Sequence, residues 1–303
     1  MVVFSECWRC KWDYPPTEVG PRGGDESLRI EKIGNTSILK FALTAYELVK
    51  QTMPKYSSKF SKKTFTLRQH AVIICLKIRE DKNYREIVEM LVEMPRIRRA
   101  IELDEIPHFT TLCKAFDRLQ SKLWRSLLKD TSELLELNGI VTIDSSGEER
   151  SRASRHYTKR INLHIQELKV TLLVDTAENA IIDAHMTTTR KHDTQIAPKL
   201  IKRCFELICT LLGDKGYDDQ EIRKMAKDLG IRPLIKHREF TNLHKAWNAR
   251  MDSDLYGQRN QSESVNSSIG RNYGSHIRSR AWYRQFREVI VKCAVHNIDR
   301  SIE

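Results

Sequence analysis

Long hydrophobic runs are missing from this sequence of 303 residues. No stretch reaches the roughly eighteen apolar residues that a membrane-spanning helix needs, so no membrane partner is expected. The amino-terminal region also lacks the apolar segment of a signal peptide, because Cys7, Arg9, Cys10 and Lys11 interrupt every short apolar stretch. We therefore expect a protein of the cytoplasm.

Cysteine is scarce as well, and its pattern argues against a disulfide framework. The seven cysteines are odd in number and are scattered through helical patterns. Cys7 and Cys10 form one Cys-x2-Cys pair, which is half of a zinc site, and no second pair with metal-ligand spacing follows. We expect residues 1–35 to form an irregular leader, with a structural zinc site as the alternative.

Acidic residues are outnumbered, since 52 lysines and arginines oppose 40 aspartates and glutamates and give a net charge of +12. One acid-free basic run comprises Arg150, Arg152, Arg155, Lys159 and Arg160. A second acid-free stretch, from Ser264 to Arg287, mixes five arginines with aromatic residues. Such stretches suit the phosphates and unpaired bases of a nucleic acid, and a solvated helix face with core aromatics is the alternative.

The pattern from residue 36 to residue 138 is helical. Apolar residues recur at helical spacing from about residues 37, 67, 84, 110 and 122 onward, and Thr110 is the expected cap of the fourth helix. The predicted helices 84–94 and 110–120 suit a helix-turn-helix-like DNA-binding unit, and a plain helical bundle is the alternative. We expect an all-helical amino-terminal domain over residues 36–138.

The character of the sequence changes at Gly139. The β-branched run at 140–143 predicts a buried strand, and further strands are expected near 160–166, 168–175, 180–185, 210–214 and 232–236. Helices are expected at 197–209 and 218–230 and again from about residue 258. Antiparallel strands followed by alternating helices and strands predict a mixed α/β sheet with flanking helices, in a domain of residues 139–303.

Two of these predicted strands end in an aspartate, Asp144 after the first and Asp214 after the run at 210–213. In open α/β sheets, ligands gather at such strand ends. Carboxylates held together there repel each other unless a divalent metal neutralises them, and oxygen-only ligands suit Mg²⁺ or Mn²⁺. Two such ions, about 3.5–4 Å apart, can activate the attacking oxygen of a phosphodiester and stabilise the leaving oxygen.

Glu263 is the candidate for the third acid that this chemistry requires. Arg259 and Glu263 follow Tyr256 by three and seven residues, so in a helix they share one face. Val265 and Ile269 would lie roughly on the opposite face. The apolar side can then anchor the helix while Glu263 points into a cleft. The alternative is an ordinary Arg–Glu surface pair, which contributes roughly 0.3–0.5 kcal/mol.

Tyr256, Arg259 and Glu263 reproduce the Y-x2-R-x3-E signature of bacterial and archaeal insertion-sequence transposases, and residues 65 to 300 resemble that family. Asp144 in Ile-Asp-Ser and Asp214 in Gly-Asp-Lys-Gly-Tyr-Asp match the contexts of its two aspartates. The family signature continues with a lysine where this sequence has Gly270, followed by Arg271. The resemblance implies an RNase H-like fold in which Asp144, Asp214 and Glu263 form the DDE triad and bind Mg²⁺, for which Mn²⁺ can substitute.

The resemblance also implies a DNA transposase that cuts the ends of an insertion sequence and joins them to target DNA. The expected partners are the double-stranded terminal repeats and the target, bound by a homodimer. Arg259 and Arg271 are expected to hold phosphates near the metals, and the run from Arg150 to Arg160 to contact the DNA backbone. Two alternatives remain: an RNase H-like nuclease without strand transfer, and a non-catalytic DNA-binding protein derived from a transposase.

Other polar residues near the predicted strands are expected to have structural roles. Asp175 is the expected turn residue after its strand, Asp218 a helix-start residue and Asp193 a helix cap. Ser145 and His185 do not indicate a hydrolase, because the nucleophile motif Gly-x-Ser-x-Gly is absent.

Overall fold

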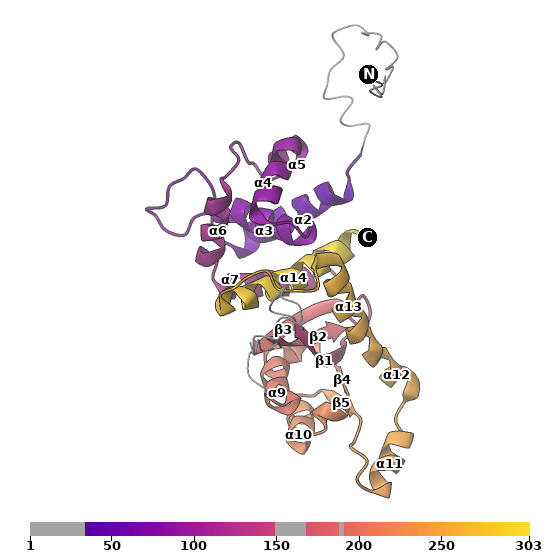
Figure 1. The fold of residues 1–303 in the computed structure, drawn as a ribbon. Helices are drawn as coiled ribbons and strands as arrows, with labels where there is room; N and C mark the ends of the chain where they lie inside the picture. The colour runs from indigo at the N-terminus through magenta and orange to yellow at the C-terminus, as the bar shows by residue number, and fades with distance from the viewer. Residues whose placement is uncertain (1–33, 149–167, 188–190) are drawn as a thin grey trace, which may run out of the picture. The chain divides into compact units, whose positions relative to one another are not determined.

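The computed structural model describes residues 34–148, 168–187 and 191–303 (Figure 1). Residues Ser37–Glu303 form one compact unit. The Cys7–Cys10 pair, the basic run from Arg150 to Arg160 and the strand expected at 160–166 lie outside the described residues. Within the described ranges, no helix combines the length and apolar character needed to cross a membrane.

The amino-terminal half consists of helices, as predicted. They are α2 (Ser37–Thr52), α3 (Leu67–Arg79), α4 (Tyr84–Glu93), α5 (Pro95–Ala100), α6 (Phe109–Arg118) and α7 (Ser121–Ser132). Capping boxes begin two of them, with Thr66 and Gln69 at α3 and Asn83 and Glu86 at α4. The expected cap of α6 was wrong, because the His108 side chain accepts the free N–H of Thr110 in the first turn.

A five-stranded mixed sheet follows, in the order β3-β2-β1-β4-β5. The strands β1 (Ile140–Glu148), β2 (Leu168–Asp175) and β3 (Ala180–Thr187) are antiparallel. The short strands β4 (Thr210–Gly213) and β5 (Arg232–Ile235) extend the sheet parallel to β1. This order, with helices on both faces, is the RNase H-like α/β fold, so the predicted fold class is confirmed.

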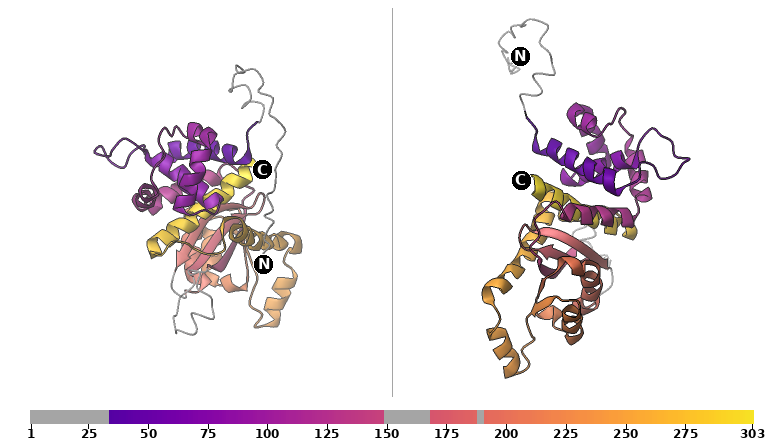
Figure 2. Two further views of the ribbon diagram at one scale, coloured as in Figure 1. Left: turned by 45° about the horizontal axis from the view of Figure 1, so that its top comes forward. Right: turned by 180° about the vertical axis from the view of Figure 1, so that it is seen from behind.

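The two faces of the sheet have separate cores, because side chains alternate along each strand. On β2, Val170, Leu172 and Val174 pack into one core and Leu173 into the other. The first core holds α7, α13 (Gln261–Tyr273) and α14 (Trp282–Ile302), and the second holds α9 (Asp193–Cys204) and α10 (Gln220–Asp228). Figure 2 shows α14 and α7 on one side of the sheet and α9 and α10 on the other.

Short elements connect β5 to α13. They are α11 (Asn242–Ala249), α12 (Ser253–Gly257) and the 3-10 turn η3 (Gln258–Asn260), and the 3-10 turns η1 (Phe205–Leu207) and η2 (Lys215–Tyr217) flank β4. The helix expected at 197–209 begins earlier, at Asp193, and ends at Cys204. The helix expected from 122 ends at Ser132, before the boundary expected near residue 137.

Helices from both halves of the chain share the first core. Phe41 of α2, Ile74 of α3 and Trp124 of α7 belong to the same buried cluster as Leu172 of β2 and Val291 of α14. Burial of this common apolar surface holds the amino-terminal helices and the sheet together. The division at residue 139 is therefore one that we propose on grounds of function, within a single compact unit.

Candidate active site

Asp144 lies on the face of β1 that α13 covers. Thr142 Oγ1 is 3.5 Å from Ser262 Oγ of α13, and Ser146 Oγ is 3.4 Å from Asn266 Oδ1 of the same helix. Because alternate residues of a strand share a face, Asp144 stands between these two contacts and on the same side. The strand therefore directs Asp144 toward the helix that carries Glu263.

Asp214 follows β4 directly beside Asp144. The parallel register pairs Ile143 with Gly213, so the next residue on each strand is an aspartate. The Asp214 carboxylate is held by the N–H of Gly216, which donates to Oδ1 at 2.8 Å. A Cβ atom on Gly216 would lie 2.8 Å from that same oxygen, so any larger residue at this position would displace the Asp214 carboxylate.

Tyr256 connects the signature segment to the end of β4. Its hydroxyl donates to the Gly213 carbonyl at 3.3 Å, and the Lys236 ammonium lies 4.5 Å from the centre of its ring. This bond fixes the backbone on which Asp214 stands. The sequence marked Tyr256 as part of a motif, but its positioning role follows only from the structure.

Glu263 lies on the exposed side of α13, and its carboxylate pairs with Arg259. Arg259 Nη2 donates to Glu263 Oε1 at 2.8 Å, and the Glu263 side chain is 59% exposed. Val265 and Ile269 are buried under the helix, as the predicted periodicity required. The Glu263 side chain is therefore free to rotate away from Arg259 while the helix stays anchored.

The three acids share one electrostatic neighbourhood. Burial raises the pKa of Asp144, and the negative charges of Asp214 and Glu263 raise it further, while the N–H of Ser145 and the Arg259 guanidinium oppose the rise. Because like charges repel, it is costly to ionise all three of these acids at the same time. A cation bound among them would remove that cost.

The three candidate ligands are all carboxylates, and carboxylate oxygens are the type of ligand that a hard divalent cation prefers. In the described ranges, no three acidic, histidine or cysteine side chains stand close enough together to ligate one ion in this arrangement. In this arrangement the Glu263 carboxylate pairs with Arg259.

A family model described as a transposase DDE domain matches residues 138–298, more than half of the chain. The chain belongs to the DDE transposase family. A search of curated proteins found no match. A solved structure of piggyBac transposase, in a synaptic complex with hairpin DNA, is similar at 10% identity and a TM-score of 0.47, covering 90% of this chain and 76% of that one.

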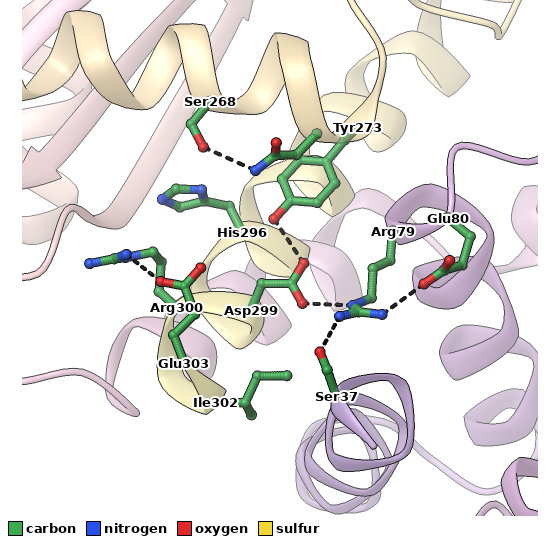
Figure 3. Close-up of a pocket in the computed structure, with 11 residues that line it drawn as sticks. Ser37, Arg79, Glu80, Ser268, Tyr273, His296, Asp299, Arg300, Ile302 and Glu303 are labelled. Carbon is green, nitrogen blue, oxygen red and sulfur yellow. Dashed lines mark hydrogen bonds and ion pairs between the residues drawn. The ribbon is translucent and has the colours of Figure 1, made fainter.

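The far end of α13 in this transposase is anchored by a polar network. The Tyr273 hydroxyl donates to Asp299 Oδ2 at 2.9 Å, and Arg79 Nε donates to Asp299 Oδ1 at 2.7 Å. Figure 3 shows Asp299 of α14 between these two partners, at a cavity of about 610 Å³. The network fixes the helix that carries Glu263 to both α14 and α3.

Ser145 faces away from Asp144, into the other side of the sheet. Its hydroxyl donates to Asp193 Oδ1 at 2.6 Å and lies 2.9 Å from the Tyr217 hydroxyl, while Lys169 Nζ is 2.8 Å from the same Asp193 oxygen. The expected cap role of Asp193 was wrong, because His192 occupies the cap position and Asp193 ties the first turn of α9 to β1 and β2. These contacts support the strand that carries Asp144.

The remaining aspartates have structural partners. Asp175 is fully buried and accepts the backbone N–H groups of Asn138, Gly139 and Ala177, as expected of a turn residue. Asp218 pairs with Arg223 at 2.7 Å, and Asp219, rather than Asp218, caps α10. The prediction of Asp218 as a helix-start residue was therefore displaced by one position.

Arg271 is exposed on α13 and lines an open hollow of about 810 Å³ together with Glu263 and Gly270. It therefore lies on the same side of the helix as the third acid. Among the described residues, nothing outside the neighbouring helix backbone lies within 4 Å of a Cβ atom built on Gly270, so the position leaves room for a side chain to begin.

Other arginines of the Ser264–Arg287 stretch hold the fold together. Arg278 pairs with Asp81 at 2.6 Å, and Arg284 pairs with Asp117. Arg287 donates to the backbone carbonyl of Asp117 at 2.9 Å. These three side chains attach the region around the start of α14 to the amino-terminal helices, so most of this stretch is committed to internal contacts.

Proposed function

We propose that this transposase cuts the ends of an insertion sequence and joins them to target DNA, with Asp144, Asp214 and Glu263 as the residues that hold divalent cations. Mg²⁺ is the proposed ion, with Mn²⁺ as a substitute. The observation that carries the proposal is the adjacency of Asp144, in the middle of β1, and Asp214, directly after the parallel strand β4, next to the helix that presents Glu263.

Each residue of the site has a distinct task in this proposal. Two divalent cations, when bound, supply the positive charge that activates water and stabilises the leaving oxygen of a phosphodiester. Asp144 and Asp214 are pre-positioned by the sheet, and Glu263 completes the set by leaving Arg259. The guanidinium of Arg259 then becomes available to a DNA phosphate, and the exposed Arg271 of α13 is a second candidate for such a contact.

DNA is the proposed partner on the basis of charge. The chain carries a net charge of +12, and Arg271 is an exposed cation on the side of the triad. We assign the phosphate contacts outside the triad to the run from Arg150 to Arg160, and recognition of the element's ends to the helices of residues 36–138. A homodimer on DNA, acting in the cytoplasm, completes the proposal.

Cleavage of DNA that carries the repeats flanking the encoding gene tests the proposal. Asp214→Asn is expected to abolish Mg²⁺-dependent cutting and to leave DNA binding intact. Asp219→Asn is the matched control, because an asparagine caps α10 as well as an aspartate does. Equal turnover in EDTA, or cutting by Asp214→Asn at the rate of the control, would overturn the assignment.

Two further assays separate the alternatives. Incubation with pre-cut ends and a target plasmid distinguishes the transposase from a nuclease, because only the former joins the free 3′-hydroxyl to the target. Replacement of all three acids by alanine tests the non-catalytic alternative. Retention of the biological activity by that triple variant would favour a DNA-binding protein over an enzyme.

A further inference from the structure

A cationic cavity of about 420 Å³ lies apart from the triad, among α3, α4, α6 and the segment that leads into α14. Four basic side chains line it, namely Lys77, Arg278, Arg280 and Arg284. Among the described residues that line it, Glu288 is the only acid, and it is 3% exposed.

Lys77 is the unusual member of this group. Lys77 is 6% exposed. In the part of the chain that the structure describes, its ammonium makes no hydrogen bond or ion pair. The ammonium lies 5.0 Å from the centre of the Tyr84 ring. Lys77 Nζ is not among the fully enclosed side-chain atoms that lack a partner in the described residues, so the ammonium keeps its access to the cavity that Lys77 lines.

A second buried lysine shows what a purely structural role looks like in this fold. Lys292 is 2% exposed, and its ammonium donates to the Gly274 carbonyl at 2.6 Å and to the His276 carbonyl at 3.4 Å. Lys77 has no such acceptors, although it is almost as deeply buried. The Lys77 ammonium is therefore available to a ligand in the cavity.

The acids near the cavity are already occupied. Asp81 pairs with Arg278 and Asp117 with Arg284. The Glu288 carboxylate accepts the backbone N–H groups of Arg278 at 2.8 Å and of Ser279 at 2.9 Å.

Two cations, Lys77 and Arg280, thus remain without an ion-paired acid among the described residues. Burial lowers the pKa of Lys77, which an anion in the cavity would counteract.

We propose that this cavity binds a phosphate group between Lys77 and Arg280. A phosphate offers several strong acceptor oxygens, and it matches both the point charge of a lysine and the planar donors of an arginine. The phosphate is either free inorganic phosphate or part of a DNA backbone that passes over the helical half. The cavity needs no cleavage chemistry, so the proposal stands independently of the proposed function.

Calorimetric titration of sodium phosphate into the full-length protein, in a chloride-matched buffer, tests the site. The wild type is expected to bind one phosphate saturably. Lys77→Met should weaken binding at least tenfold, Lys77→Arg should retain most of it, and Arg280→Ala should weaken it severalfold. Lys224→Met, an exposed lysine on α10, is the matched control and should bind like the wild type.

The folded state of each variant is checked by its thermal melt. Lys77→Met removes a buried charge and is expected to melt no lower than the wild type, so lost binding reports on the site itself. Absence of a saturable signal from the wild type, or equal phosphate affinity in Lys77→Met, would overturn the proposal.

A salt series of DNA binding, followed by fluorescence anisotropy, identifies the source of the phosphate. If a DNA phosphate fills the cavity, Lys77→Met should reduce the slope of log K against log salt by about one. If free phosphate fills it, the variant should bind DNA as the wild type does while its calorimetric signal is lost. Either result retains the phosphate site, and only the calorimetry decides whether it exists.

Discussion

The substitution Glu263→Gln separates a catalytic carboxylate from an ordinary surface ion pair. It removes one negative charge and keeps the length of the side chain. Arg259 and Glu263 are four residues apart with 2.8 Å between the paired atoms, and the Glu263 side chain is 59% exposed. Pairs of this kind contribute about 0.3–0.5 kcal/mol. The melting temperature should therefore fall by no more than about 1–2 °C.

The same substitution should reduce metal-dependent DNA cleavage far more than it reduces stability. Loss of a residue that only orients a metal ligand already lowers metal affinity or activity about 10–100-fold, and loss of a ligand itself should lower activity by more than that. The assay is single-turnover cutting of a labelled duplex that carries one element end, with a thermal melt of the same preparation. The expected result is a loss of more than about 100-fold in rate at nearly unchanged stability.

Glu47→Gln on α2 is the matched control for this experiment. Glu47 pairs with Lys50 at 3.0 Å, and its side chain is 65% exposed, so the change breaks a comparable helix-surface pair outside the site. This variant should cut like the wild type. Cutting by Glu263→Gln within about twofold of the control would show that Glu263 serves only as a surface partner of Arg259, and the reasoning would be refuted.

Three further substitutions test the triad and the anchoring of the helix that carries Glu263. Gly216→Ala places a Cβ atom 2.8 Å from the Asp214 carboxylate, so single-turnover cutting should slow by up to about 100-fold with little change in the melt; an unchanged rate would contradict the tight turn. The fold raises the pKa of Asp144, so the protonated carboxyl stabilises the folded state. This contribution is present at a pH below the ordinary pKa of an aspartate, and it is lost as the pH rises through the raised pKa. Asp144→Asn should therefore be more stable than the wild type at pH 7, and this difference in stability should become smaller in acid. Urea unfolding midpoints across the pH range measure the difference, and a difference that grows in acid would contradict the raised pKa. Tyr273→Phe removes a hydrogen bond to the charged Asp299 and should cost about 1.5–3 kcal/mol in urea unfolding, whereas an unchanged midpoint would show that the network in Figure 3 does not anchor α13.

The two aspartates were visible in the sequence because their signal is local, but the expectation that the first strand ends at Asp144 was wrong, since β1 stays paired with β2 as far as Glu148. A short buried run that ends in an acid occurs at Asp144 and again at Asp214, and the sheet places these runs side by side. The burial of Val265 under α13 was visible for the same reason, since helical periodicity alone predicts it. These local patterns specified the fold class and the candidate acids.

Contacts between distant segments could not be predicted in the same way. Arg278 and Arg284 form a basic stretch in the sequence, and their partners Asp81 and Asp117 lie in the amino-terminal helices. Nothing in the local pattern distinguishes an arginine that pairs internally from one that meets a phosphate. The core shared by the two halves was hidden for the same reason, because apolar periodicity shows which face is buried but not what covers it.

The central claim is that Asp144, Asp214 and Glu263 share divalent cations, and Mn²⁺ binding tests it most directly. Electron paramagnetic resonance of free Mn²⁺ counts the ions bound by the transposase on a duplex that carries an element end. The account predicts about two ions per wild-type protomer and the loss of at least one in the double variant Asp144→Asn, Asp214→Asn, with Asp219→Asn as the control. Equal Mn²⁺ binding by the double variant and the wild type would contradict it.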